Sequence, residues 1–274
     1  MKHSMDSLRK AQTDSNRTMA ILTLAMTFLV IAFVSALTTG KYPISLADLC
    51  AGEPMAVRTF TILRLPRALM GLVGGFGLGV AGFVYQTVFR NPLASPDIIG
   101  VSSGASAGAA FAILFTSAAS PSTTVFAFVG GLLAVCLSLG LTALSPVKEH
   151  SSIVLAGIAV HSLAQTFLMV LKLMADPEKQ LASIEYWIMG SLNGISLYSI
   201  GGNIALCLIC LVGMFLLYRQ ILLLSLDDQE GRLLGVNVTQ IRLIVLLIAT
   251  LAASSVISMT GLISFISLLA PHGA

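Results

Sequence analysis

Charged residues are scarce in this chain of 274 residues, where Asp, Glu, Lys and Arg together make up 10% of the sequence. A soluble domain usually carries about 25%, so the composition excludes a disordered chain and an ordinary soluble enzyme. The formal net charge is only +3, without the basic patch that binds DNA or RNA, so no nucleic-acid partner is expected. Hydrophobic residues reach 56%, which is typical of a protein that crosses a membrane several times.

The motifs of several enzyme classes are missing as well. There is no Walker A motif, so the chain is not expected to hydrolyse ATP by itself. There is no H-E-x-x-H pair, and the four histidines are scattered along the chain, so no metal site is expected. Cys207 and Cys210 lie in an apolar run and are expected to be packing residues. We therefore predict no catalytic residue, no metal and no cofactor bound by this chain.

Long runs without charge take the place of these motifs, and the longest extends from Ile98 to Val147. About 20 apolar residues cross a bilayer as a helix, and lipid leaves the backbone polar groups of other spanning structures unsatisfied. The expected fold class is therefore all-α, a polytopic transmembrane helical bundle. We predict about eight membrane segments, near residues 19–39, 66–89, 98–117, 123–145, 152–174, 198–218, 241–259 and 261–272, of which the last is too short to cross comfortably.

The distribution of Lys and Arg between the connecting loops predicts a cytoplasmic N-terminus. Residues 1–17 would then form a cytoplasmic tail, and residues 18–274 would form the membrane domain. The first apolar run is longer than the core of a cleaved signal peptide, so we expect it to be a retained anchor.

Glycines recur every fourth residue in two of the segments, at Gly71, Gly75 and Gly79 and again at Gly100, Gly104 and Gly108. Ridges of small residues allow membrane helices to approach closely, so we expect both to be packing faces.

The second ridge also contains a G-x-S-x-G pattern around Ser106, which in hydrolases exposes a nucleophilic serine. An alternative function is therefore an intramembrane serine protease that uses Ser106 and His161. A secondary carrier is a third hypothesis, but it would need ionisable residues inside a span, and only His161 clearly lies in one.

Polar residues between the segments are the other candidates for function. Arg64 and Arg67 flank Pro66 where the second segment begins. They are either anchors at the membrane surface or a docking point for acidic groups of an external partner. The connection that follows this segment carries two prolines, Pro92 and Pro96, which predicts a rigid turn.

The loop at 225–237 combines three leucines with an acidic start and ends near Gly235. This pattern predicts a short amphipathic helix. Its acidic character disfavours binding to anionic lipid, so we expect it to dock on a protein partner.

Seven motifs in this order resemble the FecCD-type permease family, the membrane subunits of bacterial ABC importers for iron-siderophore complexes, haem and cobalamin. The resemblance rests on Arg64-Leu65-Pro66-Arg67, residues 89–96, residues 100–105, residues 155–158, residues 186–191, residues 234–236 and Ala270-Pro271-His272. It covers the chain from about residue 20.

The resemblance implies a transmembrane permease subunit that forms the translocation pathway in the bacterial cytoplasmic membrane. Its implied partners are ABC ATPase subunits that use the ATP, an extracytoplasmic substrate-binding protein, a second permease subunit and membrane lipid. The span at 152–174 would line the pathway. Members of the family have ten spans, so the resemblance also implies a C-terminally truncated chain from which the last two are absent.

The resemblance further implies roles for particular residues. Arg64 and Arg67 would dock the binding protein. A structural motif would comprise Arg90, Asn91, Pro92, Gly100, Gly104 and Gly108. The loop that couples the permease to the ATPase would include Leu226, Asp227, Asp228, Glu230, Arg232, Leu234 and Gly235.

Overall fold

The structure is a computed structural model that describes residues 2–116, 121–144, 150–226 and 237–272. All regular secondary structure in these ranges is helical, which confirms the predicted fold class. Residue contacts divide the chain into two units, Met1–Ala68 and Leu69–Ala274.

The first unit is built around one long helix and a set of short ones. Helix α1 extends over Lys2–Thr38 and therefore includes the expected tail. The short helices are α2 (Leu46–Cys50), α3 (Pro54–Thr59) and the π-helical turn η1 (Phe60–Arg64). The π-turn leads without a break into α4 (Leu65–Phe89), so residues 54–89 form one continuous helical stretch that passes from the first unit into the second.

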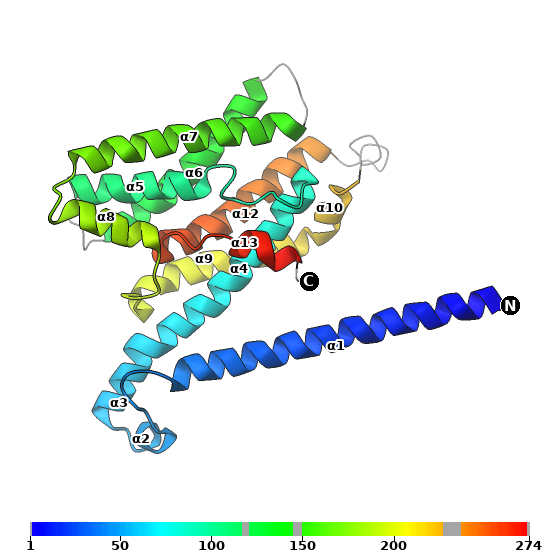
Figure 1. The fold of residues 1–274 in the computed structure, drawn as a ribbon, viewed down its shortest axis with the longest axis horizontal. Coiled ribbons are helices and arrows are strands. Elements are labelled where there is room, and N and C mark those ends of the chain that lie inside the picture. The colour runs from blue at the N-terminus through cyan, green and yellow to red at the C-terminus, as the bar shows by residue number, and fades with distance from the viewer. Residues whose placement is uncertain (1, 117–120, 145–149, 227–236, 273–274) are drawn as a thin grey trace. The chain divides into compact units, whose positions relative to one another are not determined.

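The second unit is a helical bundle in which α5 packs against α6, α7, α8 and α12, while α12 also packs against α9 (Figure 1). Its helices are α5 (Val101–Phe115), α6 (Pro121–Leu144), α7 (His150–Met174), α8 (Gln180–Met189), α9 (Leu197–Leu216), α10 (Tyr218–Leu223), α12 (Val238–Thr260), α13 (Ile266–Leu269) and the 3-10 turn η2 (Ala270–His272).

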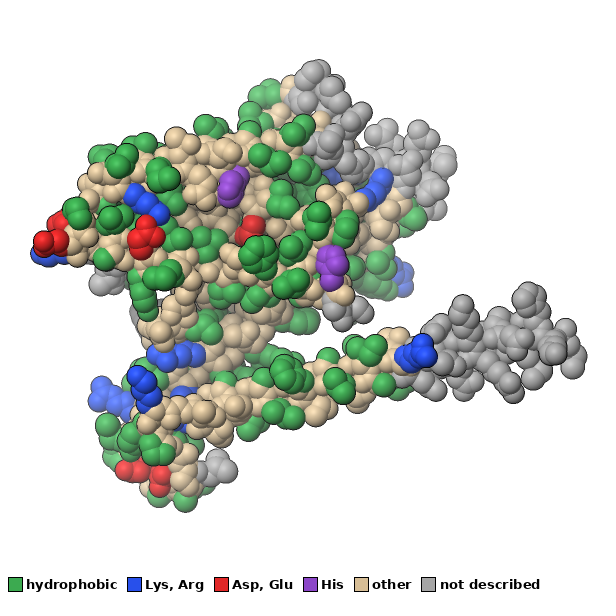
Figure 2. Space-filling model, in the orientation of Figure 1, with side chains coloured by type: hydrophobic (Ala, Val, Ile, Leu, Met, Phe, Trp, Pro, Cys, Tyr) green, Lys and Arg blue, Asp and Glu red, His purple; other side chains and the backbone are tan. Residues whose placement is uncertain are grey.

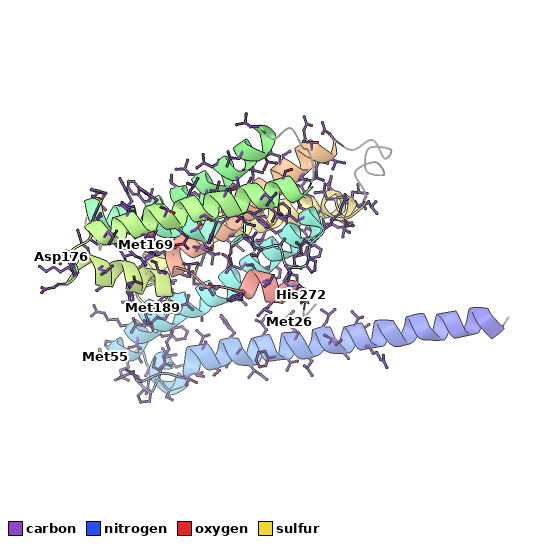
Figure 3. All side chains as sticks on the ribbon, turned by 45° about the horizontal axis from the view of Figure 1, so that its top comes forward. Met26, Met55, Met169, Asp176, Met189 and His272 are labelled. Atoms are coloured by element: carbon purple, nitrogen blue, oxygen red, sulfur yellow. The ribbon has the colours of Figure 1, made fainter. Side chains whose placement is uncertain are left out.

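Hydrophobic side chains are spread over the face of this unit that Figure 2 shows. Large hydrophobic side chains are exposed along α7 and at the end of α8; Met169 is 64% exposed and Met189 73% (Figure 3). Charged Asp176, in contrast, lies at the turn between α7 and α8 (Figure 3). A helix that crosses a bilayer needs apolar side chains in contact with lipid and charged residues near the water at its ends.

The helices agree with the first seven predicted membrane segments in position. Five of the described helices are long and apolar enough to cross a membrane, and two shorter apolar ones, Val101–Phe115 and Ile200–Leu216, correspond to the third and sixth segments. The number of segments that actually cross a membrane stays a prediction.

The eighth segment, 261–272, is not a spanning helix. The left-handed backbone of Gly261, at φ +71°, ends α12, and the chain stays non-helical up to Phe265. Only α13 and the turn η2 follow. The side-chain amide of Gln86 then donates to the Leu268 carbonyl at 3.1 Å.

The position of Gln86 along α12 shows that this segment turns back into the bundle. Tyr85, the residue before Gln86, is hydrogen-bonded through its hydroxyl group to the Thr250 hydroxyl at 2.7 Å. Thr250 lies about 15 Å before the end of α12, at 1.5 Å per residue, so Leu268 lies beside the middle of α12 rather than beyond its end. Residues 261–272 therefore re-enter the bundle alongside α4. The prediction of an eighth helical membrane segment over these residues is wrong, because the segment contains only α13 and the turn η2.

Helices α5 and α6 approach each other backbone to backbone. A Cβ atom on Gly104 would lie 2.4 Å from the Gly130 carbonyl oxygen, and one on Gly130 would lie 2.3 Å from the Gly104 carbonyl oxygen. A Cβ atom on Gly108 would lie 2.1 Å from the Phe126 carbonyl oxygen. Only glycine fits at these three positions, so the ridge on α5 is a packing face.

On α4 the predicted ridge contacts the bundle only in part. An added Cβ would meet no described atom within 4 Å at Gly75, but would lie 3.9 Å from Leu192 Cδ1 at Gly71 and 3.2 Å from the Ala270 Cβ atom at Gly79. The tightest contacts of this helix are at two other glycines, 2.6 Å to the Cys207 sulfur at Gly77 and 1.7 Å to the Ser267 carbonyl oxygen at Gly82. A packing role for the whole ridge therefore stays a prediction.

The Gly130→Ala variant is expected to destabilise the bundle, because the new carbon would overlap the backbone of α5. Overpacking of this kind costs about 1–3 kcal/mol. Gly140→Ala on the same helix is the matched control, since no described atom lies within 4 Å of the added carbon, and alanine there should stabilise α6 by about 0.5–1 kcal/mol. Thermal unfolding in detergent measures both, and equal shifts in the two variants would contradict this interface.

Candidate coupling and docking sites

Arg90 ends α4 in a conformation that usually belongs to glycine. Its φ is +48°. The Asn91 amide donates to the Gln86 carbonyl at 3.1 Å, and the Arg90 amide donates to the Thr87 carbonyl at 3.3 Å. This pair of bonds is the Schellman motif, in which the left-handed position is most often glycine. A side chain there costs roughly 1–2 kcal/mol, so the arginine is retained for another reason.

The guanidinium of Arg90 supplies that reason. Its Nε donates to the Leu224 carbonyl at 3.2 Å, and its Nη2 donates to the Leu226 carbonyl. Leu224 is the C-cap of α10, where main-chain carbonyls lack helical partners and carry partial negative charge. The cation therefore joins the end of α4 to the end of α10.

This contact brings together two sites that the sequence predicted separately, the motif that contains Arg90 and the start of the coupling loop at Leu226. The remaining predicted residues of that loop, Asp227, Asp228, Glu230, Arg232, Leu234 and Gly235, lie outside the described residues. The sequence could not predict this contact, because every residue has a main-chain carbonyl and the acceptor positions therefore have no characteristic residue type.

The turn between α4 and α5, residues 90–100, is held by its own hydrogen bonds. The Asn91 side chain accepts from the Leu93 amide at 2.9 Å, and the Ala94 amide donates to the Asn91 carbonyl at 3.0 Å. Pro92 is exposed within this turn, whereas residues 94–96 are buried. Gly100, at φ +95°, is the N-cap of α5. The turn predicted from the prolines therefore forms, and its rigidity stays a prediction.

Asp97 is the acidic residue of this turn, and the Ser102 hydroxyl donates to its carboxylate. Burial raises the pKa of the Asp97 carboxyl above its ordinary value, while the hydrogen bond from Ser102 and the nearby His161 act in the opposite direction. The carboxylate thus lies beside the first turn of α5, where the helix dipole favours negative charge.

The geometry does not support the protease alternative. Ser106 is 1% exposed, and its hydroxyl donates to the Ser102 carbonyl at 2.8 Å within helix α5. His161 lies beside Gly100 and interacts with Asp97. The nucleophile elbow of hydrolases is a strained strand-to-helix turn, whereas Ser106 is in the interior of a regular helix.

At the predicted docking site for the binding protein, the Arg64 side chain is buried rather than exposed. It is 7% exposed, and its Nη1 donates to the carbonyls of Leu37 at 2.9 Å and Thr38 at 2.6 Å, while Nη2 donates to the Tyr42 carbonyl. A Cβ atom on Gly40 would lie 2.8 Å from Nη2, so the turn after α1 closes around this guanidinium. Arg64 thus satisfies the carbonyls at the C-terminal end of α1.

Arg67 differs from Arg64, because its buried Nε has no hydrogen-bond partner among the described residues. Because that atom is buried, it offers no donor to an external protein. Docking of an external protein by either arginine stays a prediction, and the structure gives Arg64 a role inside the chain.

An all-helical bundle with five described helices long and apolar enough to cross a bilayer is the architecture of a polytopic membrane protein. The chain belongs to the FecCD transport family, whose model matches residues 28–274. This confirms the family that the seven motifs indicated. Its relatives are permeases and not enzymes.

Two relatives and one solved structure illustrate the similarity. The ferric enterobactin transport system permease protein FepG of Escherichia coli is 31% identical over 263 residues, which cover 94% of this chain and 79% of FepG. The hemin transport system permease protein HmuU of Yersinia pestis is 35% identical over 216 residues, 77% of this chain and 64% of HmuU. A metal-chelate type ABC transporter in an inward-facing conformation matches with a TM-score of 0.80 at 28% identity, over 93% of this chain and 80% of that one.

The Arg64→Gln variant should loosen the turn after α1, because three carbonyls lose their charged donor and such bonds contribute about 1.5–3 kcal/mol each. Hydrogen–deuterium exchange in detergent should be faster at residues 37–45. Arg58→Gln on α3 is the control, since the Arg58 side chain is exposed and should leave this exchange unchanged. Identical exchange in wild type and Arg64→Gln would contradict the assigned role of Arg64.

Proposed function

We propose that this chain is the transmembrane permease subunit of a binding-protein-dependent ABC importer that takes up an iron chelate. The observation that carries the proposal is the family match over residues 28–274, supported by the 0.80 TM-score to a metal-chelate transporter. The chain spans 64–80% of the length of these relatives.

The substrate class follows from the relatives. FepG is named for ferric enterobactin and HmuU for hemin. Both are iron held in a large organic ligand. We propose an iron-siderophore complex first, and haem or cobalamin next. Helix α7 would line the pathway.

The proposed mechanism is alternating access driven by ATP in partner subunits. Two ATPase subunits bind ATP and close, the loops at 226–235 move with them, and the pathway of a permease dimer opens to the other side. No residue of this chain takes part in covalent chemistry. The N-terminus would be cytoplasmic, and an extracytoplasmic binding protein would deliver the chelate near Arg64 and Arg67.

The acidic start of the predicted coupling loop provides the test of the ATPase contact. Asp227→Lys combined with Asp228→Lys should weaken co-purification with the ATPase subunit of the same transport system, because two charges at the proposed interface are reversed. We expect retention to fall about tenfold or more, which corresponds to about 1.4 kcal/mol.

The matched control is Asp176→Lys combined with Glu178→Lys, which makes the same change of charge in the exposed turn between α7 and α8. This control should retain the ATPase subunit. Full retention in both double variants would show that the loop at 226–235 does not hold the ATPase.

A further inference from the structure

The turn at residues 90–100 is packed between two helices of the bundle. The Ser138 hydroxyl of α6 donates to the Ile99 carbonyl at 3.1 Å. Helix α7 approaches the same residue so closely that a Cβ atom on Gly157 would lie 2.9 Å from the Ile99 Cα atom. Ile99 is 3% exposed. A displacement of this turn therefore cannot occur without displacing α6 and α7, because close-packed interiors transmit strain.

The same turn is fastened at its other end to the segment that precedes residue 227. Arg90 donates from two different nitrogens of one rigid, planar guanidinium to the carbonyls of Leu224 and Leu226. Two bonds from a planar group restrict rotation as well as distance. Because both acceptors are main-chain carbonyls, a movement of the backbone at residues 224–226 would move the Arg90 guanidinium with it.

We propose that Arg90 is a positioning residue for energy coupling. It ties the start of the coupling loop to the turn at 90–100, so that movement of the loop by the ATPase reaches α6 and α7 through this turn. The inference rests on the proposed importer function and adds to it the residue that transmits the movement.

The strained backbone of Arg90 supports this role. A residue kept at φ +48° where glycine would avoid the strain is compensated by its surroundings, and the two carbonyl contacts are that compensation. A residue that served only to end α4 would be better as glycine, since the Schellman motif needs no side chain at this position.

Arg90→Gly gives a variant that tests coupling directly, because it keeps the left-handed turn and removes the guanidinium. The unfolding temperature should fall, because the two bonds to the Leu224 and Leu226 carbonyls contribute more than the relief of backbone strain returns. We expect the variant to fold and to keep its co-purification with the ATPase, but with a lower ratio of chelate transported to ATP hydrolysed in proteoliposomes that contain the assembled importer. The ratio should fall about fivefold or more, the lower end of typical coupling between sites.

Arg90→Lys should restore part of the ratio, because an ammonium group can donate to a carbonyl but lacks the planar fork. Arg219→Gln is the matched control. It removes a guanidinium from α10 whose Nε donates to the Tyr218 hydroxyl at 3.0 Å, and the ratio should stay at the wild-type value.

Three results would overturn the role of Arg90: a wild-type ratio in Arg90→Gly, loss of ATPase binding in that variant, or an equal fall in Arg219→Gln. Absence of ATP-dependent transport by the unsubstituted importer would instead overturn the proposed function. The two failures are distinguishable, because the second one is measured without any substitution.

Discussion

The backbone contact between α5 and α6 at Gly104 and Gly130 is the constraint on which the rest of the bundle depends. Lipid gives helices no hydrophobic reason to associate, so association depends on close packing, and these two glycines bring each backbone against the other's carbonyl oxygen. Their contact places the start of α5, and the turn that leads into it, against α6 and α7. The Ser138 hydroxyl of α6 donates to the Ile99 carbonyl in that turn, and Arg90 at the start of the turn donates to the Leu224 carbonyl.

Arg64 and Arg90 solve the same chemical problem in different parts of the chain. A helix leaves its last carbonyls without partners, and the C-terminal end carries partial negative charge. Arg64 donates to carbonyls at the end of α1, and Arg90 donates to carbonyls at the end of α10. Each arginine belongs to a motif that first indicated a docking or turn function, and each is used within the chain to fasten a helix end.

Sequence patterns predicted the helices, which depend on composition and on the length of apolar runs. They missed the features that depend on main-chain geometry. Charge-free runs located seven helices, and the prolines at 92 and 96 predicted the turn before α5. The re-entry of residues 261–272 was missed because an apolar run has the same appearance whether it spans or turns back, and the left-handed Phe265 has no sequence signal. The hydrogen bonds of Arg64 and Arg90 were missed because their acceptors are backbone carbonyls.

The third hypothesis for this chain, a secondary carrier driven by an ion gradient, also predicts an apolar helical bundle. Uptake of a ferric siderophore into proteoliposomes that contain this chain with its ATPase and binding protein distinguishes the two most directly. Our account predicts uptake that requires ATP and all partner proteins and is unaffected when ion gradients are collapsed. Uptake that proceeds without ATP, and stops when an ion gradient is collapsed, would contradict it.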